Sequence, residues 1–136
     1  MLHFPKTARI LRSAEFRKVY DNGVRFSGPL FAAFCLKRVE AAPNIAEELP
    51  ARVVPPLTGP RLGLTVPRAV GKAVDRNRIK RRLREAFRLL CIPENTNGAG
   101  IKGNWDIVLN PRKAVLTATY PEIEEAIRKV IIRCNK

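Results

Sequence analysis

The sequence predicts a single α+β domain of two layers, in which helices pack on one sheet, with the element order α-β-β-β-α-β-α. Hydrophobic residues make up 46% of the 136 residues, which is enough for a core within one domain. Short apolar runs bounded by Gly and Pro alternate with segments whose apolar residues recur every three or four positions. No internal repeat or low-complexity tract interrupts this order, so we expect residues 1–136 to form one domain.

The first predicted element is a short helix at residues 13–20 (SAEFRKVY). The hydroxyl of Ser13 suits an N-cap, and Asn22-Gly23 suits the end of the helix. Phe16 and Tyr20 are four residues apart and therefore share one face.

The next predicted elements are a short strand around residues 24–26 and a strand at 30–37 (LFAAFCLK). A strand alternates its side chains between two faces. One face then carries Phe31, Ala33 and Cys35, and the other carries Ala32, Phe34 and Leu36. The stretch at about 38–60 is rich in proline and lacks periodicity, which predicts a long loop inserted into the domain.

The second half predicts two more strands and two more helices. Residues 61–68 (RLGLTVPR) predict a strand that Pro67 ends, and residues 105–110 (WDIVLN) predict another. Residues 120–133 predict the last helix, with Thr119 as its cap. Its apolar stripe consists of Ile123, Ile127, Val130 and Ile131.

The stretch DRNRIKRRLREAFR, residues 75–88, predicts an amphipathic helix with a strongly basic face. It holds seven Arg or Lys against two acids, Asp75 and Glu85. At about 100° per residue, the apolar stripe lies within roughly 80° of Ile79. That stripe contains Ile79, Leu83, Ala86, Phe87 and Leu90. The opposite side carries Asn77, Arg81, Arg84 and Arg88, flanked by Arg78, Arg82 and Glu85.

The basic face predicts a polyanionic partner. Most charge runs only solvate a helix, but here the whole chain shares the sign, with a formal net charge of +14. RNA, DNA and an anionic membrane are the candidates. No apolar run approaches the ~20 residues that span a bilayer, and the N-terminal residues lack the pattern of a signal peptide. Arginine favours nucleic acid, because guanidinium binds phosphate bidentately and stacks on bases.

The scarcity of histidine and the spacing of cysteine argue against catalysis by the protein itself. His3 is the only histidine, and no phosphate-binding loop or dense carboxylate cluster is present. The three cysteines, Cys35, Cys91 and Cys134, are far apart and include no C-x-x-C pair. We therefore expect no catalytic residue, no metal site and no disulfide framework, and we expect buried thiols in a reducing cytoplasm.

Two further groups of residues allow two interpretations each. Phe16, Tyr20, Phe31 and Phe34 are either core residues or a platform on which single-stranded RNA bases stack, since cations flank them. Arg68 and the pair Arg112-Lys113 follow two predicted strands. They are either solvated loop charges or one end of an RNA-binding cleft, if those strands are neighbours.

The segment RLGLTVPRAVGKAVDRNRIKRRLREAFR resembles the signature of the bacterial ribonuclease P protein component, with Arg76-Asn77-Arg78 at its centre. LRSAEFRKVYDNG is similar to the family's first helix, and WDIVLNPRK to its late strand. The resemblance implies a fold like that of ribosomal protein S5 domain 2, with a left-handed β-α-β crossover. Physical reasoning alone favours the right-handed form, which holds in about 98% of parallel crossovers.

The resemblance also implies a function. Ribonuclease P removes the 5′ leader of precursor tRNA by hydrolysing one phosphodiester bond, and its RNA subunit is the catalyst, working with Mg²⁺. The implied partners are that RNA and the leader, with no membrane and no protein oligomer. Residues implied to contact the catalytic RNA are Lys72, Arg76, Asn77, Arg78, Lys80, Arg81, Arg82, Arg84 and Arg88. Residues implied to form a leader cleft are Phe16, Tyr20, Phe31, Phe34, Arg68, Arg112 and Lys113.

Two other classes of function predict different behaviour. A basic structural protein of the ribosome or of another ribonucleoprotein would bind RNA without affecting the cleavage of precursor tRNA. A protein nuclease would cleave without RNA, but it needs a general acid or base that the sequence does not offer in a recognisable cluster.

Overall fold

The computed structural model describes residues 9–10, 12–37, 60–91, 100–101 and 103–135. The predicted insertion at 38–60 lies outside these residues, apart from Pro60. The predicted order α-β-β-β-α-β-α is confirmed, with two short 3-10 turns added. The elements are α1 (Ser13–Asn22), β1 (Val24–Ser27), β2 (Phe31–Lys37), β3 (Arg61–Leu64), η2 (Arg68–Val70), α3 (Ala73–Leu90), β4 (Trp105–Pro111), η4 (Lys113–Leu116) and α4 (Tyr120–Cys134).

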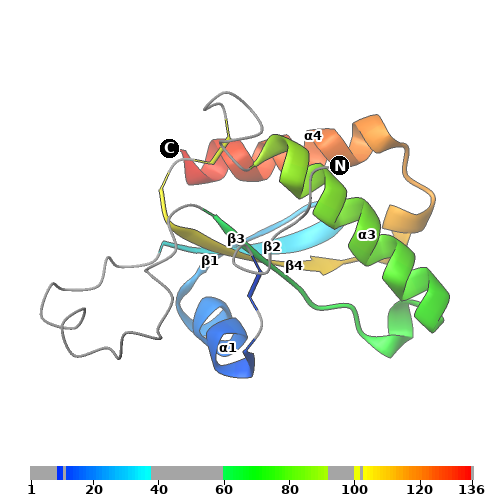
Figure 1. The fold of residues 1–136 in the computed structure, drawn as a ribbon, viewed down its shortest axis with the longest axis horizontal. Coiled ribbons are helices and arrows are strands. Elements are labelled where there is room, and N and C mark those ends of the chain that lie inside the picture. Colours follow the sequence, from blue (N-terminus) through cyan, green and yellow to red (C-terminus); the bar gives the residue numbers. More distant parts are fainter. Residues whose placement is uncertain (1–8, 11, 38–59, 92–99, 102, 136) are drawn as a thin grey trace, which may run out of the picture.

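The four described strands form one sheet in the order β1-β2-β4-β3 (Figure 1). β1 pairs with β2 and β2 with β4 in antiparallel fashion, whereas β3 and β4 are parallel neighbours joined by α3. Arg9 forms an isolated parallel bridge with Leu62 at the outer edge of β3, where the Ile10 N–H donates to the Leu62 carbonyl at 2.9 Å. The carboxyl ends of β3 and β4 therefore lie at the same end of the sheet.

Helices cover both faces of the sheet, so the prediction of two layers is wrong. α1 packs on one face, and α3 and α4 pack on the other (Figure 1). The predicted alternation of β2 explains this arrangement: Phe31, Ala33 and Cys35 belong to the core under α3 and α4, whereas Phe34 and Leu36 pack in a smaller cluster under α1. Both faces of β2 are apolar, and each needs a covering helix.

The local ends of two elements differ from the prediction. Ser13 does not cap α1: the N-cap position is Arg12, which makes no side-chain cap bond. The predicted strand at 61–68 ends at Leu64, and Arg68 begins the η2 turn just after Pro67. The last helix is as predicted, since the Glu122 N–H donates to the Thr119 hydroxyl at 3.3 Å.

The three cysteines are buried free thiols, as predicted. They lie in the core under α3 and α4. Burial raises the pKa of the Cys91 thiol far above its ordinary value, so this side chain behaves as a small apolar group.

Candidate nucleic-acid interface

α3 presents a basic face that begins at its N-terminus. Ile79, Leu83, Ala86 and Phe87 are buried against the sheet and α4, as the helical period predicts. Asn77, Arg78 and Arg81 are exposed, and Lys72 is exposed at the N-cap position. Together with the half-buried Arg76 and Arg84, they form what we call the basic face: Lys72, Arg76, Asn77, Arg78, Arg81 and Arg84.

The side chains of two arginines on α3 bind other groups of the protein and do not point into solvent. Arg82 donates hydrogen bonds to the backbone carbonyls of residues 115, 116 and 118, at 2.6, 3.3 and 2.7 Å. Arg88 is only 8% exposed and forms an ion pair with Glu85 at 2.6 Å. α4 lies beside the C-terminal part of α3 and covers a second side of it, which a single apolar stripe does not reveal (Figure 1). The placement of Arg82 and Arg88 on an outward RNA-facing surface is therefore not supported.

An open groove runs along α1. It has a volume of about 620 Å³, and we call it the aromatic groove. It is lined by Ser13, Phe16, Arg17, Tyr20 and Asp21 of α1, by Leu64, Thr65 and Val66 at the end of β3, and by Lys80 of α3. Lys80 thus comes to the groove from the same helix that carries the basic face, which makes the two surfaces neighbours.

Tyr20 is held in a fixed orientation. Its hydroxyl donates to the Asn110 amide oxygen at 2.8 Å and lies 2.7 Å from the Thr65 hydroxyl. Its ring meets Phe34 edge to face, with centroids 4.8 Å apart, and the Arg25 guanidinium lies over the Phe34 ring. Phe34 therefore supports Tyr20 from behind and does not itself line the groove.

Phe16 packs directly on the backbone of β3. A Cβ atom built on Gly63 would lie 2.7 Å from Phe16 Cε1 and 2.9 Å from Cζ. Real Cβ atoms do not approach so closely, so the ring occupies space that only glycine leaves open. Gly63 therefore sets how deep Phe16 lies in the aromatic groove.

The remaining predicted cleft residues are placed differently. Phe31 is 2% exposed and lies in the core on the opposite face of the sheet, so the structure does not bring it together with Phe16 and Tyr20. Arg68, Arg112 and Lys113 are exposed. They follow the carboxyl ends of the neighbouring strands β3 and β4, and none of them is among the residues that line the groove.

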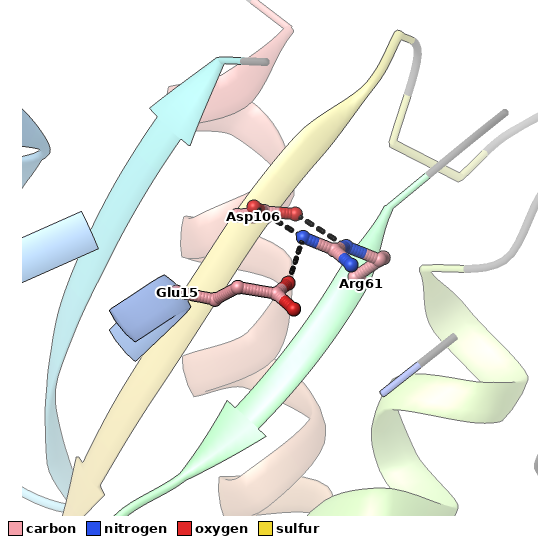
Figure 2. A network of polar contacts seen from close by, with 3 residues as sticks. All are labelled: Glu15, Arg61 and Asp106. Carbon is pink, nitrogen blue, oxygen red and sulfur yellow. Dashed lines mark hydrogen bonds and ion pairs between the residues drawn. The ribbon is translucent and has the colours of Figure 1, made fainter. Parts of the chain in front are cut away.

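A polar network fixes α1 to the sheet (Figure 2). Arg61 of β3 donates two hydrogen bonds of 2.8 Å to the Asp106 carboxylate of β4, and its guanidinium also pairs with Glu15 of α1 at 2.6 Å. The hydrogen bond to Asp106 raises the pKa of Arg61. Because Glu15 directly precedes Phe16, this network also fixes the start of the aromatic groove.

Several residues of the site escape prediction from sequence. Thr65 lines the groove, and Asn110 orients Tyr20. Arg9 lies beside the sheet edge at Leu62. Burial lowers the pKa of Arg84, and the charge of Arg9 lowers it further. Arg17 also lines the groove, and the sequence indicated it as one of the cations that flank the aromatic residues.

Two other kinds of feature are absent from the residues that the structure describes. None of their helices is both long and apolar enough to cross a membrane. In the same part of the chain, no group of three or more His, Cys, Asp or Glu is arranged to hold a metal ion.

Comparison with known proteins points to one family. The sequence pattern described as "Ribonuclease P" matches residues 4–135. The ribonuclease P protein component of Clostridium kluyveri is 33% identical over 123 residues, which are 90% of this chain and 90% of that protein. The same component of Xanthomonas oryzae pv. oryzae is 36% identical over 133 residues, 97% of this chain and 74% of that protein. The solved structure of the Staphylococcus aureus RNase P protein has a TM-score of 0.63 at 25% identity, covering 90% of this chain and 94% of that one.

Proposed function

The chain belongs to the ribonuclease P protein family, whose members are protein components of an endoribonuclease. We propose that its two surfaces bind two different RNAs. The basic face of α3 binds the catalytic RNA, and the aromatic groove holds the 5′ leader of precursor tRNA. One observation carries this proposal: Lys80 reaches the groove from the helix that bears the basic face, so one RNA-bound helix also borders the leader.

The basic face suits a folded RNA because it presents several cations on one rigid element. Arg78 and Arg81 are exposed on consecutive turns, and each guanidinium is able to contact a phosphate bidentately. Each contact releases counterions, so affinity falls as salt rises. By partly neutralising phosphate repulsion, the protein also lets the RNA fold and act at lower Mg²⁺.

The aromatic groove suits a single strand. Phe16 and Tyr20 offer ring surface on which unpaired bases stack, and Arg17 and Lys80 offer positive charge to the strand's phosphates. The hydrogen bonds of Tyr20 to Asn110 and Thr65 orient its ring before the strand arrives. Arg68, Arg112 and Lys113 extend the positive surface past the end of the groove.

We assign the hydrolysis itself to the RNA partner, with Mg²⁺ bound at the RNA active site. The residues of the groove support this division, because they are rings and cations that bind and orient a strand. We place the complex in the cytoplasm, consistent with three free thiols.

For the fold, we propose the left-handed form of the β3-α3-β4 crossover and a likeness to ribosomal protein S5 domain 2. The parallel pairing of β3 with β4 shows that α3 is a crossover connection, and its left hand is what the family resemblance implies. The Thermotoga maritima RNase P protein adds support at the level of fold, with a TM-score of 0.65 at 24% identity over 92% of this chain and 96% of that one.

The role of the basic face is tested by the salt dependence of RNA binding. We expect Arg78→Ala combined with Arg81→Ala to weaken binding to the catalytic RNA by about 1–3 kcal/mol and to make the plot of log affinity against log salt less steep. The matched control is Arg128→Ala with Lys129→Ala, which removes the same charge from exposed positions of α4. Equal effects of the two pairs would show that net charge, and not the basic face, governs binding.

A further inference from the structure

Arg82 belongs to the arginine-rich motif, yet its guanidinium is bonded inside the protein. One terminal nitrogen donates to the Val115 and Leu116 carbonyls, and the other donates to the Ala118 carbonyl. Arginine has five N–H donors, and at least three of them are used here. At about 100° per residue, Arg82 lies about 60° from Ile79, at the border of the buried stripe on the side of η4.

Two of the carbonyls that Arg82 binds belong to the end of the 3-10 turn η4, and the third, that of Ala118, lies two residues beyond it. The last carbonyls of any helical turn lack partners within it. In η4 the Ala114 carbonyl accepts from the Thr117 and Ala118 amides, at 3.2 and 3.0 Å. The carbonyls of Val115, Leu116 and Ala118 instead receive the Arg82 guanidinium, so this one side chain completes the turn.

The segment held in this way carries two exposed cations. Residues 112–119 join β4 to α4, and the Arg112 N–H donates to the Leu30 carbonyl at 2.8 Å. Val115 is fully buried and anchors the middle of the segment. Arg112 is therefore fixed through its own N–H, and Lys113 lies between that point and the carbonyls that Arg82 binds from α3.

We propose that Arg82 is a positioning residue that sets the distance between the basic face of α3 and the cations Arg112 and Lys113. This inference rests on the proposed function, in which both surfaces contact RNA in one complex. Its consequence is that Arg82 affects RNA binding through the 112–118 segment and not by touching phosphate.

The geometry suits arginine better than lysine at this position. A planar guanidinium presents two terminal nitrogens at a fixed spacing, which here serve three carbonyls spread over residues 115–118. A lysine ammonium keeps the charge but is a single point donor. Arg82→Lys therefore removes the positioning while leaving the net charge of the helix unchanged.

The test is a double-mutant cycle in the reconstituted complex with the catalytic RNA. Binding of leader-bearing precursor tRNA is measured at several salt concentrations for the wild type, Arg82→Lys, Lys113→Ala and the double variant. We expect each single variant to weaken binding roughly three- to tenfold. We expect the double variant to be no more than about twofold weaker than Arg82→Lys alone, because Lys113 is already displaced.

Hydrogen exchange supplies the direct structural readout on the free protein. The Val115, Thr117 and Ala118 amides are hydrogen-bonded within the segment, and we expect Arg82→Lys to speed their exchange. The Gly23 amide, bonded to the Val19 carbonyl on the other side of the sheet, serves as the internal reference and stays unchanged. Arg128→Lys on α4 is the control for an arginine-to-lysine change at an exposed site.

Three results would overturn the assignment. Independent, multiplicative effects of Arg82→Lys and Lys113→Ala would show that Arg82 does not act through Lys113. Faster exchange with unchanged RNA binding would leave Arg82 a purely structural residue. Failure of the wild-type protein to bind the catalytic RNA would instead overturn the proposed function, and this inference with it.

Discussion

Gly63→Ala is the most specific perturbation of the aromatic groove that the structure offers. The added methyl would lie 2.7 Å from Phe16 Cε1 and 3.2 Å from Ile10 Cβ. The Phe16 contact is with the far end of a half-buried side chain, so the ring moves outward and the backbone of β3 stays in place. The substitution therefore shifts Phe16 without removing it.

The size of the effect differs between stability and binding. Overpacking a core costs about 1–3 kcal/mol, and we expect about 1 kcal/mol here because the ring has room to move. A base stacked on an aromatic ring contributes about 1–3 kcal/mol, so losing the correct ring position weakens leader binding roughly 5- to 150-fold. Affinity for mature tRNA, which has no leader, stays the same.

The assay compares dissociation constants of the reconstituted holoenzyme for precursor and mature tRNA, alongside unfolding in urea. Gly28→Ala is the matched control, because its added methyl would meet only the Phe31 carbonyl, at 3.6 Å. An equal loss of affinity for both RNAs, or no loss for the precursor, would refute the assignment of Phe16 to leader binding.

Three further predictions concern the framework that holds the two surfaces. Arg61→Met removes the bidentate partner of the buried Asp106 and is expected to lower the free energy of unfolding in urea by about 3 kcal/mol; unchanged stability would contradict the role of this network. The hydrogen bond from Arg88 lowers the pKa of Glu85 in the folded protein. This bond therefore stabilises the fold at pH values above the pKa that Glu85 has in the unfolded chain, and the stabilisation is lost as pH falls through the folded-state pKa of Glu85. Glu85→Gln should thus reduce stability slightly near pH 7 and not at all near pH 2, and an equal reduction at both would be inconsistent. Burial raises the pKa of Cys91, and all three thiols are buried, so a thiol-specific reagent should label them only on unfolding; rapid labelling of the native protein would contradict this burial.

Local patterns predicted most of the fold. The alternation in β2 correctly placed Phe31 and Phe34 on opposite faces, and the helical period in α3 correctly placed Ile79 and Phe87 in the core. These patterns depend on neighbours in the sequence, which is why they are readable without a structure. They do not show which helix covers which face of the sheet, and for that reason the predicted number of layers was wrong.

The candidate site was predicted less completely, because it depends on contacts between distant residues. In the sequence, Arg82 does not differ from the other arginines of the motif. Its role depends on carbonyls of Val115 and Ala118, which lie 33 and 36 residues further along the chain. The alternation of β2 separated Phe31 from Phe34, but it did not show that α1 covers only the face of Phe34. Lys80 joined the groove because α3 passes close to the end of β3, which no local pattern encodes.

The central claim is that this protein serves a catalytic RNA, and the most direct measurement is to isolate the protein from its cells and sequence the RNA bound to it. We expect one dominant structured RNA that, freed of protein and supplied with Mg²⁺, removes the 5′ leader from precursor tRNA. Ribosomal RNA, a mixture without a dominant species, or cleavage by the protein alone would contradict it.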